Sequence, residues 1–244
     1  MKLILGAAAA VTAYALLAEP LRKYLRRRTA SIKLTYFNLD GLGEPIRLTL
    51  ALAGARFEDY RFKSRDEFGA LKPKLRFGQV PCLEVNGTEL VQSAAVMRYV
   101  ARAFDTSGLL YPSDLQAAAL VDALIDQVKD MTTGRMVFRY KARFWGSAAD
   151  AILTESVVES IEKAWLEEVL PTHLAFFAKV ASESPTQWLA GTASPTIADI
   201  MVATQLKMLS AFSGKLPGSL DAYVNNVYAL PAVVAWRQRE AELK

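Results

Sequence analysis

The 244-residue chain contains a single cysteine, Cys82, and a single histidine, His173. One cysteine excludes an intrachain disulfide and a cysteine-based metal cluster, and one histidine excludes metal sites built on a histidine pair. Glycine and proline are also scarce, at 13 and 10 residues, whereas 52% of the residues are hydrophobic. This composition excludes a fibrous repeat and a disordered chain, and it predicts one large globular domain or two small ones.

Positive charge is concentrated in the first 30 residues. Six basic residues and one acidic residue fall there, a formal charge of +5, and the remaining 23 basic and 24 acidic residues leave −1 for residues 31–244. The folded part therefore lacks the net positive field that is typical of nucleic-acid binding. We expect no nucleic-acid partner.

A stretch without charges runs from Leu3 to Ala18, and the basic segment Leu21–Arg28 follows it. The stretch is marginally long enough to span a bilayer. Basic residues on its C-terminal side predict a membrane anchor that leaves the body in the cytosol. A targeting segment for mitochondria or another organelle, and a cleaved secretory signal, remain open alternatives.

Residues 31–106 have the pattern of an α/β domain. Alternating apolar residues, helix-start signals and turn residues predict its elements in the order strand, helix, strand, short helix, two strands, helix: 32–38, 44–54, 57–62, 65–75, 80–85, 89–91 and 94–104. Asn86-Gly87 predicts a hairpin turn, and Ser93 is expected to cap the last helix. The order is thioredoxin-like without a Cys-x-x-Cys motif, so we expect this domain to bind a thiol, with Cys82 buried and structural.

Residues 107–113 are interpreted as a linker, and residues 114–244 are predicted to be all-helical. Leu120, Leu124, Val128 and Met131 recur at helical spacing. Thr196–Asp199 has the Ser/Thr-x-x-acid form of a capping box at the start of a further helix. These signals predict a helical C-terminal domain.

Five motifs resemble the N-terminal domain of cytosolic glutathione transferases. They are Lys33–Asn38, Gly-x-Glu-Pro-Ile-Arg within 41–47, Gly78–Pro81, Leu90–Ser93 and Arg98-Tyr99. The similarity covers residues 31–242 and is greatest to the sigma class among tyrosine-type enzymes, which includes haematopoietic prostaglandin D synthases and S-crystallins. The resemblance implies an α/β thioredoxin-like domain followed by an all-α domain, and a detoxification enzyme that conjugates glutathione, its co-substrate, to small electrophiles.

The resemblance also implies the roles of individual residues. It assigns catalysis to Tyr36, whose hydroxyl would donate to the sulfur of glutathione and lower the pKa of the thiol. It implies that Val80, before a cis proline, pairs with the peptide backbone, and that Gln92 and Ser93 hold the γ-glutamyl carboxylate at a helix N-terminus. The further glutathione-binding residues that it implies are Phe68, Lys72, Gln79, Pro81 and, across a homodimer, Asp130.

Two departures from the family pattern bear on function. Leu42 stands where the family often carries a basic residue near the tyrosine hydroxyl, which brings full activation of the thiol into question. Lys129 interrupts the acids Asp126 and Asp130, which in prostaglandin D synthases belong to a divalent-ion site, so neither a metal nor that specialisation is expected. A non-catalytic glutathione-binding or structural protein of the same fold, or a glutathione-dependent isomerase or peroxidase, remains open.

Overall fold

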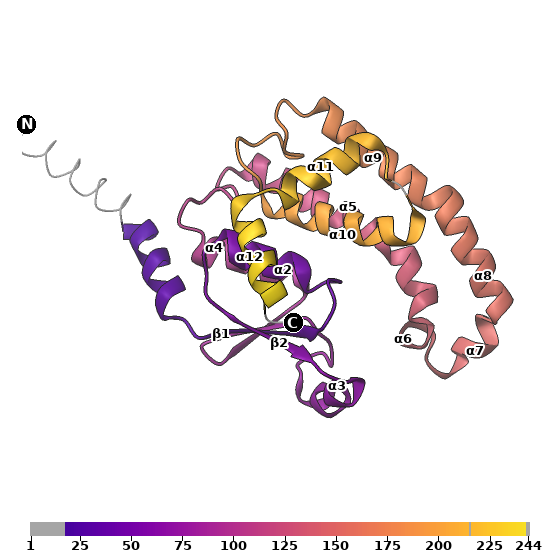
Figure 1. Ribbon diagram of the computed structural model, residues 1–244. Coiled ribbons are helices and arrows are strands. Elements are labelled where there is room, and N and C mark those ends of the chain that lie inside the picture. Colours follow the sequence, from indigo (N-terminus) through magenta and orange to yellow (C-terminus); the bar gives the residue numbers. More distant parts are fainter. Residues whose placement is uncertain (1–17, 215, 243–244) are drawn as a thin grey trace, which may run out of the picture.

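A computed structural model describes residues 18–214 and 216–242 of the chain (Figure 1). Its N-terminal part is a four-stranded sheet in the order β2-β1-β3-β4. The strands are β1 (Ile32–Phe37), β2 (Glu58–Phe62), β3 (Cys82–Val85) and β4 (Thr88–Val91). β1 runs parallel to β2 and antiparallel to β3, and β3 and β4 form the predicted hairpin. The thioredoxin-like arrangement of the sheet is confirmed.

Three helices accompany the sheet: α2 (Glu44–Leu52), α3 (Arg65–Leu71), which continues into the 3₁₀ turn η1 (Lys72–Lys74), and α4 (Ser93–Phe104). α2 and α4 pack against each other, and their apolar residues Leu48 and Met97 join Leu34 and Leu83 of the sheet in one buried core. Alternation on the strands and helical spacing on α2 and α4 bring these side chains to one face, where burial stabilises both layers.

The prediction that Ser93 caps α4 is wrong. Gln92 occupies the N-cap position, its side chain makes no capping hydrogen bond, and Ser93 is the first residue of the helix. Gln92 has φ +69°, a left-handed value that residues other than glycine rarely adopt. The chain therefore enters α4 through a sharp bend, and no side chain caps the helix at this position. The first backbone N–H groups of the helix are thus available to a ligand.

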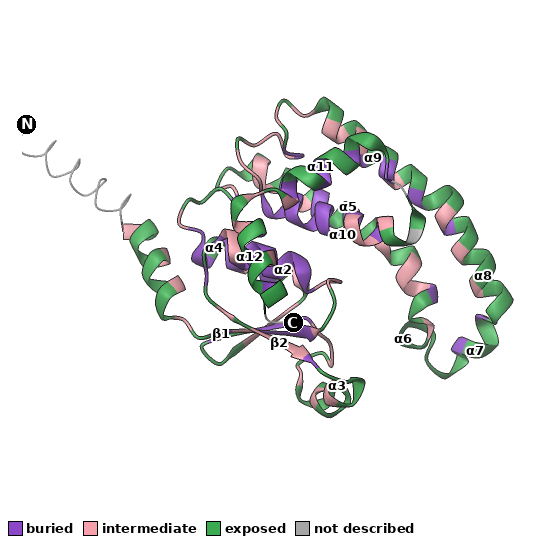
Figure 2. Ribbon diagram, in the orientation of Figure 1, coloured by how far each residue is buried: buried purple, intermediate pink, exposed green. Residues whose placement is uncertain are grey.

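The C-terminal part is helical, as predicted. Its elements are α5 (Leu115–Arg139), α6 (Lys141–Trp145), η2 (Gly146–Ala148), α7 (Ala149–Ile152), α8 (Glu155–Ala164), η3 (Trp165–Val169), α9 (Leu170–Glu183), α10 (Ile197–Ser213), α11 (Gly218–Tyr228) and α12 (Pro231–Glu242). α10 packs against α2, α4, α5 and α11, and Figure 2 shows long buried stretches on α2 and α10, whereas α8 is mostly exposed. α10 thus joins the helical part to the sheet part.

Two local predictions in the helical part have different outcomes. The capping box at the start of α10 is confirmed, because Thr196 and Asp199 exchange side-chain and backbone hydrogen bonds. The apolar stripe of α5 is only partly right: Leu124, Val128 and Met131 are buried, but Leu120 is 55% exposed. Each four-residue step turns 40° beyond a full circle, so an early position in the stripe rotates out of the interface.

The predicted anchor, Leu3–Ala18, lies outside the described residues except for Ala18. Residues 18–29, which follow it, are helical. Within the described part of the chain, every helix is too short or too polar to cross a bilayer. Arg26 and Arg27 of this segment donate to the carbonyl oxygens of Ala103 and Ala53 at 3.4 and 3.3 Å, near the C-terminal ends of α4 and α2, where a cation is favourable.

Candidate functional site

Three predicted features meet at one end of the sheet. Thr35 of β1 pairs with Cys82 of β3, and Cys82 pairs with Val91 of β4. Tyr36, which follows Thr35, therefore lies at the same end as the Val80–Pro81 peptide before β3 and the Gln92-Ser93 pair after β4. The Val80–Pro81 peptide is cis, as predicted. Strand pairing alone brings residues from 36 to 93 into one site.

The hydroxyl of Tyr36 is held by the turn that follows β1. Its Oη accepts a hydrogen bond from the backbone N–H of Leu42 at 3.1 Å, and the side chain is only 8% exposed. A phenol oxygen that accepts one hydrogen bond still has its own O–H to donate. Tyr36 is thus placed to donate a hydrogen bond to a ligand at this end of the sheet.

Glycine at positions 41 and 43 lets the turn approach the tyrosine ring. A Cβ at Gly41 would lie 2.6 Å from Tyr36 Oη, and a Cβ at Gly43 would overlap the ring at Cδ1. Gly41 also has φ +40°, a conformation that glycine adopts without steric cost. Glycine at these two positions therefore allows the backbone of the turn to pack directly against the Tyr36 side chain.

Burial raises the pKa of Tyr36, and Tyr140 adds to this effect; the Leu42 hydrogen bond and the positive charge of Arg47 act in the opposite direction. A raised pKa keeps the phenol protonated at neutral pH. Tyr36 can therefore act as a hydrogen-bond donor, and its environment does not favour a role as a general base.

Arg47 of α2 holds the backbone between β1 and the turn. Its buried guanidinium pairs with Asp59 at 3.0 Å and donates to the carbonyl oxygens of Leu39 at 3.0 Å and Phe37 at 3.3 Å. Its Cζ also lies 5.9 Å from the centre of the Tyr36 ring, within the range of a cation–π contact. The sequence motif that contains Arg47 thus supplies support for the tyrosine as well as the helix start.

The residues expected to hold the two ends of glutathione differ in their exposure. Gln92 is exposed and Ser93 half-buried at the start of α4. The exposed Lys72 runs past Gly78, where a Cβ would lie 3.5 Å from Lys72 Cγ, which brings the lysine close to the half-buried Gln79-Val80 segment.

Phe68 of α3 is part of an aromatic cluster that connects this helix to Tyr36 on β1. Its ring lies 5.1 Å from that of Phe37 and 5.6 Å from that of Phe62, and the Phe37 ring lies 5.6 Å from that of Tyr36. Phe68 is half-buried, so its packing role is established by these contacts, and its glutathione-binding role remains a prediction.

Asp130 lies exposed on α5, beside the exposed Asp126 and Lys129. Its predicted role needs a second copy of the chain and stays a prediction. Cys82 is buried, as predicted, and burial with the nearby Glu89 and Glu84 raises its pKa to about 11. A thiol with so high a pKa is protonated at neutral pH and is therefore unreactive.

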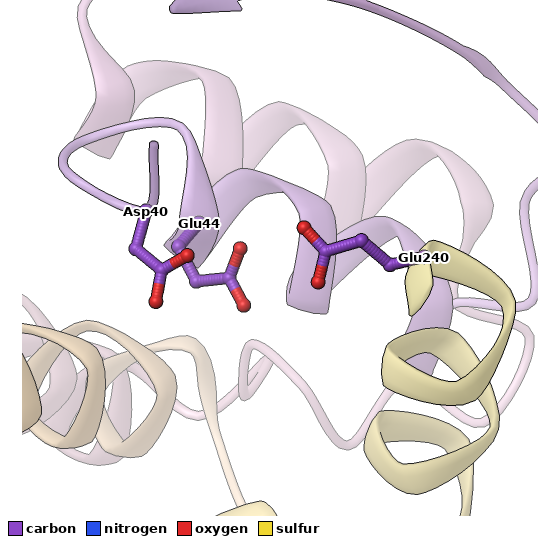
Figure 3. Close-up of side chains that lie close together, drawn as sticks. All are labelled: Asp40, Glu44 and Glu240. Carbon is purple, nitrogen blue, oxygen red and sulfur yellow. The ribbon is translucent and has the colours of Figure 1, made fainter. Parts of the chain in front are cut away.

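The structure also forms contacts that the sequence analysis did not predict. Asp40, Glu44 and Glu240 place carboxylate oxygens within 4.8 Å of one another, with Glu240 of α12 directed toward Glu44 (Figure 3). Arg237 Nη1 lies 3.5 Å from Asp40, 3.0 Å from Glu44 and 3.2 Å from Glu240. One guanidinium nitrogen thus lies close to all three carboxylates and offsets part of their negative charge.

A second unpredicted contact involves Gln205. Its side chain on α10 donates from Nε2 to the carbonyl oxygen of Gly41 at 3.2 Å. A sequence signal exists for it, since a glutamine among the mostly apolar residues of a buried helix must find a hydrogen-bond partner. The partner lies 164 residues away, and no local pattern identifies it.

Comparisons with known proteins agree over most of the chain. The family model "Glutathione S-transferase, N-terminal domain" matches residues 32–102, and "Glutathione S-transferase, C-terminal domain" matches residues 150–240. Glutathione S-transferase 1 of Ascaris suum is 37% identical over 84% of this chain and 94% of its own length. Hematopoietic prostaglandin D synthase of Gallus gallus is 33% identical over 85% and 95%.

Solved structures give the same result. A glutathione S-transferase of Ascaris lumbricoides superposes with a TM-score of 0.64 at 35% identity, over 86% of this chain and 97% of that chain. A prostaglandin synthase D of Nilaparvata lugens superposes with a TM-score of 0.72 at 27% identity, over 85% and 97%. The chain is therefore an enzyme of the glutathione S-transferase family.

Proposed function

We propose that this enzyme conjugates the thiolate of glutathione to small electrophiles, with Tyr36 as the residue that activates the thiol. The observation that carries the proposal is the Tyr36 hydroxyl, which accepts the Leu42 N–H and keeps its own proton to donate. An unperturbed thiol has a pKa of about 8.5, and only the thiolate is a strong nucleophile. Donation from Tyr36 to the sulfur favours the thiolate, whose proton passes to solvent. The sulfur electron pair then forms the new C–S bond as halide leaves an aryl halide, or as the C=C π bond of an enone opens and its carbon takes up a proton from solvent.

The remaining predicted residues bind the peptide. The backbone of Val80 pairs with the cysteinyl backbone in the manner of an added strand. The γ-glutamyl carboxylate lies at the N-terminus of α4 beside Gln92 and Ser93, where free N–H groups and the helix dipole favour an anion. Lys72 faces the glycyl carboxylate, and Phe68 and Gln79 line the space between them.

Leu42 contributes through its backbone, since the residue often basic in the family is a leucine here. The Leu42 N–H bonds the Tyr36 oxygen, and the nearest cation that acts on the pKa of Tyr36 is Arg47. Thiol activation in this chain therefore depends on the hydroxyl and the peptide dipole rather than on a side-chain cation at position 42.

The function is tested with residues 18–244 purified and supplied with glutathione. We expect retention on immobilised glutathione and turnover with at least one aryl halide or enone from a panel that also includes hydroperoxides. Binding without any turnover would favour the non-catalytic alternative, and turnover with hydroperoxides alone would favour a peroxidase. A folded protein that fails to bind glutathione would contradict the proposal.

We also propose that the enzyme acts as a homodimer in which Asp130 of one copy contacts the γ-glutamyl amine bound by the other. Its support is the exposure of Asp130 on α5 and the family resemblance. One solved relative, from Necator americanus, is described as monomeric, so sedimentation of the purified protein is informative. A monomer at micromolar concentration with undiminished glutathione affinity would contradict the role of Asp130.

The leader is proposed to hold the body on the cytosolic face of a membrane. Leu21, Tyr24 and Leu25 are exposed on the helical segment 18–29 beside its basic residues, which suits a helix at a lipid surface. We expect the full-length protein to resist carbonate extraction and to be digested by protease added to sealed membranes. Recovery as a carbonate-soluble, protease-protected protein that lacks its first residues would support import or export instead.

A further inference from the structure

The peptide group between Gly41 and Leu42 is held at both of its polar ends. Its N–H, from Leu42, donates to Tyr36 Oη at 3.1 Å, and its C=O, from Gly41, accepts from Gln205 Nε2 at 3.2 Å. One rigid planar unit therefore connects a side chain of the helical domain to the hydroxyl of Tyr36. Rotation of this unit would break both hydrogen bonds together.

The burial of Gln205 favours its hydrogen bond to Gly41. It is 1% exposed on α10, a helix that packs against α2 and α4 of the sheet domain. A buried amide without a hydrogen-bond partner loses its bonds to water without replacement, so it is strongly favoured to find one. The bond to Gly41 therefore satisfies the glutamine and at the same time constrains the turn.

The ends of the same turn are held separately by α12. Arg237 pairs with Asp40, which begins the turn, and with Glu44, which follows it as the first residue of α2. Figure 3 shows Asp40 and Glu44 side by side, with Glu240 of α12 approaching from the opposite side. These contacts fix where the turn begins and ends. They do not fix its central peptide, whose plane turns about ψ of Gly41 and φ of Leu42, and glycine, which has no Cβ, allows a wide range of ψ.

We infer that Gln205 is a positioning residue for Tyr36, which orients the Gly41–Leu42 peptide so that its N–H donates to the tyrosine oxygen. A donor on the peptide oxygen also strengthens the hydrogen bond made by the peptide N–H, because linked hydrogen bonds polarise one another. Polarisation of the Tyr36 oxygen makes its O–H a better donor to the sulfur of glutathione. This inference rests on the proposed role of Tyr36 and adds the helical domain to the activation of the thiol.

The test is Gln205→Met, which keeps an unbranched side chain of similar length and removes the donor. We expect kcat to fall about two- to tenfold, as for one lost neutral hydrogen bond, the KM for glutathione to change less than twofold, and the pKa of the bound thiol, followed by thiolate absorbance, to rise. The matched control is Thr204→Val on the same helix. Thr204 is buried and bonds only the carbonyl oxygens of Ile200 and Met201 among the described contacts, so thiol ionisation should be unchanged.

Two further comparisons separate positioning from a loss of structure. In a Tyr36→Phe background, Gln205→Met should have no additional effect on kcat or on thiol ionisation, because its target oxygen is gone. In Gln205→Glu, the neutral carboxyl group can donate to Gly41, so activity relative to the native enzyme should recover at low pH and fall as the carboxyl ionises.

An equal loss of kcat in both backgrounds, an effect confined to KM, or an equal effect of Thr204→Val would overturn the inference. If Tyr36→Phe itself leaves thiol ionisation unchanged, the proposed function fails, whatever Gln205 does. The two failures are thereby distinguished.

Discussion

Replacement of Asp199 by alanine is expected to destabilise the protein by on the order of 4 kcal/mol, a large part of the 5–15 kcal/mol that holds a typical domain folded. The carboxylate is fully buried and accepts from Thr196 N at 2.7 Å, Thr196 Oγ1 at 3.0 Å, Leu189 N at 2.9 Å and Tyr223 Oη at 2.9 Å. Alanine leaves these donors buried and without this acceptor, and each unsatisfied group costs about 1–3 kcal/mol.

Denaturant unfolding of the purified variants measures the effect. The matched control is Asp114→Ala, since Asp114 is an exposed N-cap of α5 whose side chain accepts only from Ala117 N among the described contacts. Loss of such a cap costs about 1 kcal/mol. Equal destabilisation by the two substitutions would show that burial of the Asp199 network adds nothing.

The same residue gives the stability a pH dependence of known sign. Burial raises the pKa of Asp199, although hydrogen bonds from Thr196, Leu189 and Tyr223 oppose the shift. The folded state therefore holds the proton more tightly than the unfolded state, and this contribution to stability is lost as the pH rises through the folded-state pKa. Asp199→Asn removes the titration, so stability relative to the native protein should rise with pH over that range.

Tyr36→Phe carries the largest expected effect on activity. The substitution removes one hydroxyl and little volume, so the fold and the contacts of glutathione with Gln92, Ser93 and Lys72 should survive. Loss of one hydrogen bond to a charged group costs about 1.5–3 kcal/mol, which corresponds to a decrease of about ten- to a hundredfold in kcat. The pKa of the bound thiol should rise, and the affinity for glutathione should change little.

Tyr60→Phe on the neighbouring strand β2 is the control, because the Tyr60 hydroxyl interacts with Glu67 at 3.4 Å instead. Leu42→Arg should lower the pKa of the bound thiol if the family's basic residue contributes to activation. Unchanged activity and thiol ionisation in Tyr36→Phe would mean that another group activates the sulfur.

Local hydrogen-bonding patterns and periodicity were readable from the sequence. The alternation of residues 32–38, the Asn86-Gly87 turn and the Thr196–Asp199 capping box each involve residues within a few positions of one another. Such signals specify their own conformation, and the structure has each of them where it was expected. The order of these elements was enough to predict a thioredoxin-like sheet and a helical second part.

The contacts around Tyr36 were decided by tertiary packing. Helical spacing placed both Leu120 and Leu124 on the apolar stripe of α5, but Leu120 is exposed and Leu124 is buried. The rotation of successive positions moves some of the stripe out of the interface, and only the packing of α5 determines where the interface ends. Gln205 reaches Gly41, and Arg237 reaches Glu44, across 164 and 193 positions. The sequence indicates that a buried amide or carboxylate needs a hydrogen-bond partner. Only the packing of α10 and α12 against the sheet domain determines which backbone or side-chain group is that partner.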